Sequence, residues 1–88
     1  MVSRKVEIAN KMGFHMRPAS DFVAAMSKYD ADINIVFNGK KINGKSTMSI
    51  MAGCIKCGSE ITVECDGKDE QAMLDEAVKI IKSGFGED

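Results

Sequence analysis

Apolar and polar residues alternate in several short stretches of this chain, a pattern typical of β-strands with one buried face. In the clearest stretch, Ile33, Ile35 and Phe37 occupy every second position. The Asn38-Gly39 dipeptide follows and favours a tight hairpin, because both residues tolerate φ > 0. We predict strands at Val2–Ala9, Asp32–Phe37, Lys40–Asn43 and Glu60–Asp66. The residues expected to face the core are Val6, Ile8, Ile33, Ile35, Phe37, Ile61, Val63 and Cys65.

Three other segments carry apolar residues at helical spacing. We predict helices from about Met16 to Lys28, from Thr47 to Ala52, and from Asp69 to near Gly84. Their apolar residues are Phe22, Val23, Met26 and Tyr29 in the first, Met48, Ile50 and Met51 in the second, and Leu74, Ala77, Val78 and Ile81 in the third. Ser46 and Asp69 are of the kind that caps a helix N-terminus, and Gly53 is expected to end the second helix.

The predicted order is strand, helix, strand, strand, helix, strand, helix. Because the strands alternate and each helix has one apolar face, we expect an α+β open-faced sandwich with helices on one side of the sheet. The 88 residues suffice for one domain with a modest core, residues 1–88, and contain no linker or internal repeat.

Composition narrows the function classes. The net charge is −1, with acidic and basic residues mixed along the chain, whereas nucleic-acid binding usually requires a basic face. Five aromatic residues and no tryptophan leave little material for stacking on bases. No apolar run is long enough to span a membrane or to form a signal peptide. We therefore expect a cytoplasmic protein that neither binds nucleic acid directly nor inserts into a membrane.

The candidate chemistry is concentrated in residues 11–21, KMGFHMRPASD, which hold the only histidine and the only proline. Gly13 permits a tight loop, and Pro18 favours the first turn of a helix, which places His15 at the helix N-terminus. Backbone N–H groups and the helix dipole favour an anion there, and the planar guanidinium of Arg17 can bind it as well. These residues predict a phosphohistidine site. The alternative is a surface or capping histidine.

The three cysteines, Cys54, Cys57 and Cys65, do not predict a disulfide framework, since their number is odd and no secretion signal precedes them. The Cys-x-x-Cys spacing of Cys54 and Cys57 also occurs in redox and zinc sites. A redox pair, however, normally opens a helix after a strand, and a zinc site needs two more ligands. We interpret Cys54 and Cys57 as small loop residues and Cys65 as a buried strand residue, with no metal and no cofactor expected.

The chain resembles the HPr family, the histidine-containing phosphocarriers of the bacterial phosphoenolpyruvate-dependent sugar phosphotransferase system. Residues 13–19, GFHMRPA, are similar to the family's active-site signature. Residues 43–51, NGKSTMSIM, are similar to its second signature, around the regulatory serine of the Gram-positive members. The resemblance covers essentially the whole chain. It implies the family's fold, a four-stranded antiparallel sheet with three helices on one face in the order βαββαβα.

The resemblance also implies a function. Enzyme I would pass a phosphoryl group from phosphoenolpyruvate to Nδ1 of His15, and a sugar-specific enzyme IIA would remove it, so the protein would be a carrier in a relay and not itself an enzyme. An imidazole suits this role because its ring nitrogen is a nucleophile that can form a covalent intermediate. Ser46 would be phosphorylated by an HPr kinase/phosphorylase, and that form would bind a transcription regulator in carbon catabolite repression.

Specific residues follow from the same resemblance. His15 and Arg17 would carry the chemistry, with Pro18 and Ala19 forming a helix start that stabilises the phosphoryl group. The partner-binding residues would be Phe14, Met16, Ser20, Thr47, Met48 and Met51. Phe14 departs from the family pattern, which usually has a smaller aliphatic residue there, so its bulkier ring could alter either the surface that faces partners or the His15 loop. From the pattern alone, Met48 and Met51 fit a core-filling role equally well.

Two other functions remain open on the sequence. One is a purely regulatory HPr homologue that acts through its serine, although such homologues lack the acceptor histidine that this chain has. The nitrogen-related phosphotransfer branch would keep His15 and use other partners. The second function is an α+β RNA-binding module, which the neutral charge and the absence of stacking aromatics on the strands oppose.

Overall fold

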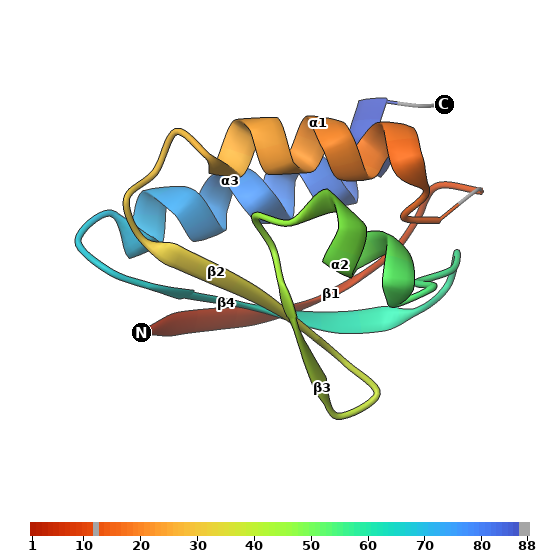
Figure 1. Ribbon diagram of the computed structural model, residues 1–88, viewed down its shortest axis with the longest axis horizontal. Coiled ribbons are helices and arrows are strands. Elements are labelled where there is room, and N and C mark those ends of the chain that lie inside the picture. Colours follow the sequence, from red (N-terminus) through yellow and green to blue (C-terminus); the bar gives the residue numbers. More distant parts are fainter. Residues whose placement is uncertain (12, 87–88) are drawn as a thin grey trace.

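The computed structural model describes residues 1–11 and 13–86 as a four-stranded sheet with three helices above one face (Figure 1). The elements are β1 (Val2–Glu7), α1 (Met16–Met26), β2 (Asp32–Phe37), β3 (Lys40–Asn43), α2 (Thr47–Ala52), β4 (Glu60–Asp66) and α3 (Glu70–Lys82), followed by a short 3-10 turn, η1 (Gly84–Gly86). This is the predicted βαββαβα order, and the predicted fold class is confirmed. No helix in the described part of the chain is long and apolar enough to cross a membrane.

The sheet is antiparallel throughout, with the strand order β1-β4-β2-β3. Its register puts the predicted apolar residues on one face, since Ile35 lies opposite Ile42 on β3 and Val63 on β4. Of the predicted core-facing residues, only Phe37 is half-buried instead of buried, because it lies at the hairpin end of β2. The hairpin turn is formed by Asn38 and Gly39, both with positive φ as expected.

The helices bury their apolar stripes against this face. Phe22 and Met26 of α1 and Ile50 of α2 have no exposed surface. Helix α3 buries the predicted residues and also Met73, which the predicted stripe omitted. At roughly 25 cal/mol per Å² of apolar surface removed from water, a shared core of this kind is the main source of stability.

Two element ends differ from the prediction. Strand β1 ends at Glu7, two residues before the predicted end at Ala9. Beyond it, the Ile8 carbonyl accepts the Gly58 N–H at 2.8 Å and the Ile8 N–H donates to the Ser59 carbonyl at 2.9 Å. Helix α1 stops at Met26, also two residues early. There the Ser27 hydroxyl donates to the Val23 carbonyl at 2.7 Å, a local side-chain bond that competes with helix continuation.

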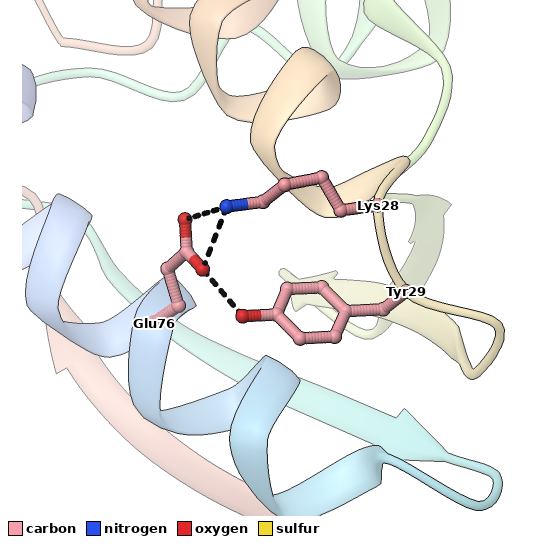
Figure 2. Close-up of polar contacts among 3 residues, drawn as sticks. All are labelled: Lys28, Tyr29 and Glu76. Carbon is pink, nitrogen blue, oxygen red and sulfur yellow. Dashed lines mark hydrogen bonds and ion pairs between the residues drawn. The ribbon is translucent and has the colours of Figure 1, made fainter.

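Polar contacts fix the segment that follows α1 (Figure 2). The Glu76 carboxylate of α3 accepts hydrogen bonds from the Tyr29 hydroxyl and from the Lys28 ammonium (3.1 and 3.2 Å). Asp69 occupies the predicted N-cap position of α3, but its carboxylate accepts the N–H groups of Asp30 and Ala31 (3.0 and 2.9 Å) and makes no cap bond. The predicted capping role of the Asp69 side chain is therefore wrong, because those two amides bind it instead.

Candidate functional site

His15 is the N-cap residue of α1, at the point where an extended loop becomes a helix. Its backbone is extended (φ −87°, ψ −173°), and its carbonyl accepts the Ala19 N–H at 3.0 Å, the first intrahelical bond. The residue is half-buried. The prediction that His15 lies at a helix N-terminus is confirmed.

The loop before His15 is held closely against the segment 55–57. The Phe14 N–H donates to the Ile55 carbonyl at 2.9 Å. Gly13 has a φ of +69°, and a Cβ placed on it would lie 2.6 Å from the Ile55 carbonyl oxygen and 2.8 Å from Lys56 Cα. Only glycine fits this position, because a side chain would meet both an unfavourable backbone angle and a backbone obstacle. The approach of these two segments sets the position of His15.

The first turn of α1 offers two backbone donors to an anion. The N–H groups of Met16 and Arg17 precede the first intrahelical bond and lie at the positive end of the helix dipole. The Arg17 side chain is exposed, and no acidic residue lies in this turn. Pro18 has no N–H and the Ala19 N–H already binds the His15 carbonyl, so neither amide is available to a phosphoryl group. Pro18 and Ala19 are both buried in the first turn and form the helix start, as expected; that this helix start stabilises a phosphoryl group stays a prediction.

Phe14 belongs to the core and not to a partner-binding surface. Only 3% of the residue is exposed. Its ring meets Phe22 edge-on, with centroids 5.4 Å apart, and lies against Phe85 at 4.7 Å. The partner-binding role expected for Phe14 is wrong, because the ring fills the space between α1 and the C-terminal turn.

Ser46 is the N-cap residue of α2, as predicted. Its hydroxyl oxygen accepts the Ser49 N–H at 3.2 Å, and Gly53 is the C-cap residue of this six-residue helix. The Ser46 residue is half-buried. A phosphate at this position would lie beside the N–H groups of the first turn, which tolerate negative charge.

The other expected partner-binding residues lie on α1, next to His15, and on α2, which packs against α1 (Figure 1). Met16 is 64% and Met48 is 84% exposed, two of the three strongly exposed large apolar residues in the described part of the chain. Ser20 is exposed, whereas Thr47 and Met51 are half-buried, and Met51 packs on the core. Each of these two exposed methionines is a flexible apolar side chain available for contact.

The cysteines fit no metal cluster. Cys54 and Cys57 are exposed and Cys65 is buried, and within residues 1–11 and 13–86 no group of three or more His, Cys, Asp or Glu side chains could hold a metal ion. Burial raises the pKa of the Cys65 thiol to about 11, which makes it unreactive near neutral pH.

Two residues that support the His15 loop were not predicted. Asn10 is buried, and its side-chain N–H donates to the Gly13 carbonyl at 2.7 Å, while the Gly13 N–H donates to the Asn10 carbonyl at 3.1 Å. Phe85 lies beyond the last predicted helix and packs on Phe14. The sequence contains a weak indication of the role of Asn10, since an asparagine shortly before a glycine often forms a turn by hydrogen-bonding to nearby backbone. Nothing in the sequence indicated the role of Phe85.

Comparisons with known proteins agree with this geometry. Residues 2–83 match the family model described as "PTS HPr component phosphorylation site". The chain is 36% identical to phosphocarrier protein HPr of Treponema pallidum over the full length of both chains. It is 35% identical to the HPr-like protein Crh of Bacillus subtilis, covering 93% of this chain and 96% of Crh.

The structural comparison gives the same result. The crystal structure of HPr-C-His from Thermoanaerobacter tengcongensis superimposes with a TM-score of 0.96 and 38% identity, covering 100% of this chain and 99% of that one. Both the sequence and the fold thus match over nearly all of the chain, with a histidine at the start of α1. The chain belongs to the HPr family of phosphocarriers of the phosphotransferase system.

Proposed function

We propose that His15 accepts a phosphoryl group from enzyme I, which draws it from phosphoenolpyruvate, and passes it to a sugar-specific enzyme IIA. The observation that carries this proposal is the place of His15 at the start of α1, beside two first-turn N–H groups and Arg17. An N–P bond forms on the imidazole as the bond between phosphorus and the donor breaks. In the second transfer this N–P bond breaks as phosphorus bonds to the acceptor group of enzyme IIA.

The surroundings of His15 suit a group that must remain transferable. Two amides, the helix dipole and one exposed guanidinium stabilise negative charge moderately, by about 1–2 kcal/mol. A metal or an arginine cluster would hold the phosphoryl group more tightly and slow its release. We infer that the protein is a cytoplasmic carrier, with turnover supplied by its partners and no cofactor of its own.

Enzyme I and enzyme IIA would both contact the exposed apolar surface beside His15. Met16 follows His15 directly, and Met48 lies on the neighbouring helix α2 with 84% of the residue exposed. Interfaces of a shuttle are small and short-lived, and flexible methionines can adapt to more than one partner.

The first test is the intact mass of the protein after incubation with phosphoenolpyruvate and enzyme I. We expect one acid-labile phosphoryl group on wild type and none on His15→Ala, with Ser46→Ala behaving as wild type. Arg17→Lys should be phosphorylated more slowly, because lysine cannot reproduce the planar guanidinium. Unmodified wild type, with an enzyme I shown to be active on another HPr, would refute the proposal.

The proposed docking surface has its own test. Met48→Asp should weaken binding to enzyme I while leaving thermal stability nearly unchanged, because this side chain buries almost nothing in the free protein. Ala72→Asp, on the exposed part of α3, is the matched control and should bind normally. A collapse of stability in Met48→Asp would show instead that this methionine belongs to the core.

A second function is favoured by the N-cap position of Ser46 and by the similarity to Crh. We propose that an HPr kinase/phosphorylase phosphorylates Ser46, and that the added charge weakens contact with an acidic surface of enzyme I and recruits a catabolite-control transcription regulator. Wild type should gain one acid-stable phosphate with this kinase and ATP, and Ser46→Ala none. Absence of the modification on wild type would refute the regulatory role.

A further inference from the structure

The C-terminal turn η1 packs against the loop that carries His15, although about 70 residues separate them in sequence. The contact is aromatic: the ring centroids of Phe85 and Phe14 lie 4.7 Å apart, with the rings inclined at 38°. Phe14 in turn meets Phe22 of α1 edge-on. Phe14, the residue directly before the proposed acceptor, is thus held between α1 and the C-terminal turn.

The backbone of Phe85 is in the left-handed region, with φ 60° and ψ 25°. Bulky residues rarely adopt this conformation, and it persists only where the surrounding packing enforces it. The conformation keeps the ring half-buried against the core. Such backbone strain is concentrated at functional positions, and at Phe85 it holds the ring against Phe14, the residue next to His15.

The same turn also lies next to Asn10, the buried residue that closes the loop. A Cβ placed on Gly84 would lie 3.6 Å from the Asn10 Cβ, an ordinary van der Waals contact. Asn10 donates its side-chain N–H to the Gly13 carbonyl. The turn therefore lies beside the first residue of the loop, Asn10, and contacts Phe14 near the end of the loop.

We propose that Phe85 is a positioning residue for phosphoryl acceptance, which acts through Phe14 to hold the backbone of His15. The inference rests on the proposed function of His15. Loss of the Phe85 ring would leave a void beside Phe14, and a neighbouring side chain that can shift into a void carries its backbone with it. A shift of this kind in an acceptor group slows transfer, because the reacting atoms must be close and aligned.

The test compares Phe85→Ala with Phe85→Leu and with Phe37→Ala. Phe37 is the matched control, since it is also half-buried on the core but lies at the hairpin end of β2. We expect kcat/KM for phosphorylation by enzyme I to fall roughly three- to tenfold in Phe85→Ala, to recover to within about twofold in Phe85→Leu, and to stay unchanged in Phe37→Ala. If Phe85→Ala does not fold, Phe85→Gly takes its place in both measurements, because glycine also removes the ring and adopts the left-handed backbone conformation without strain.

Amide hydrogen exchange gives a second readout that does not depend on phosphorylation. The Phe14 N–H, bound to the Ile55 carbonyl, should exchange faster in Phe85→Ala and at the wild-type rate in Phe37→Ala. Equal kinetic losses in the two alanine variants, or none, would overturn the inference, as would unchanged exchange at Phe14. A wild type that accepts no phosphoryl group would instead refute the proposed function, and the exchange data would still decide whether Phe85 holds Phe14.

Discussion

The contact between the His15 loop and segment 55–57 can be tested at one position, Gly13. An alanine there would keep a φ near +69° and would place its Cβ 2.6 Å from the Ile55 carbonyl oxygen, 2.8 Å from Lys56 Cα and 3.0 Å from the Cys57 nitrogen. All three atoms belong to the backbone, so no side chain can rotate away. The loop, segment 55–57 or both must move.

Gly39→Ala is the matched control, because Gly39 has a similar φ of +77° and nothing within 4 Å of its ideal Cβ. The left-handed conformation costs a non-glycine residue roughly 1–2 kcal/mol, and the lower entropy of the unfolded alanine chain offsets about 0.4–1 kcal/mol of this. We therefore expect Gly39→Ala to lower the free energy of unfolding by about 1 kcal/mol. Overpacking adds about 1–3 kcal/mol at Gly13, so Gly13→Ala should lose about 3 kcal/mol.

Urea unfolding followed by circular dichroism measures both losses, and the rate of phosphorylation by enzyme I measures the displacement of His15. Gly13→Ala should lose more stability than Gly39→Ala. In the absence of urea, where Gly13→Ala is still folded, it should also be phosphorylated more slowly than wild type. Gly39→Ala should be phosphorylated at the wild-type rate. Equal stability losses in the two variants would refute the reasoning, since the backbone obstacle would then contribute nothing.

Three further predictions concern single side chains. Ser46→Ala should lower the free energy of unfolding by about 1 kcal/mol, measured by urea unfolding, because the N-cap hydrogen bond is lost. Ser46→Asp should keep most of the wild-type stability, because aspartate can also cap a helix. Alkylation followed by mass spectrometry at pH 8 should label two of the three thiols in the folded protein, and labelling of Cys65 without unfolding would contradict its burial. The pKa of the Glu76 carboxyl lies below its ordinary value of 4.5, mainly because of the hydrogen bond from the Tyr29 hydroxyl and secondly because of the one from Lys28. The ionised carboxylate therefore stabilises the fold above pH 4.5, and this stabilisation is lost as the pH falls through the pKa of the folded protein. Glu76→Gln should therefore destabilise the protein at pH 7 but much less at pH 3, as measured by thermal unfolding, and an equal loss at both pH values would contradict this assignment.

Local patterns were sufficient to predict most of the fold. The alternation in β2 and β4 predicted both strands with their observed ends, because one buried face requires apolar residues at every second position. Ser46 and Gly53 likewise predicted both ends of α2. The ends of β1 and α1 were each placed two residues too far, because a loop contact and a serine hydroxyl bond replace the regular pattern there.

The candidate site was predictable where its chemistry is local and not where it depends on distant contacts. A histidine, an arginine and a proline within four residues were enough to place His15 at the start of a helix, since backbone N–H groups at that end are a property of any helix. The family resemblance, by contrast, assigned Phe14 to a partner-binding surface, and this was wrong because sequence alone does not show whether a large apolar residue beside a site is exposed or buried.

The sequence by itself thus determined the order of elements, the helix start at His15 and the cap at Ser46, all of which follow from interactions within a few residues. Only the tertiary structure decided that segment 55–57 fixes Gly13, that Phe14 lies in the core, and that Phe85 from the far end of the chain packs against it. The physical reason is that these contacts join residues about 40 to 70 positions apart. Periodicity and capping report on neighbours along the chain, whereas such packing exists only once the chain has folded.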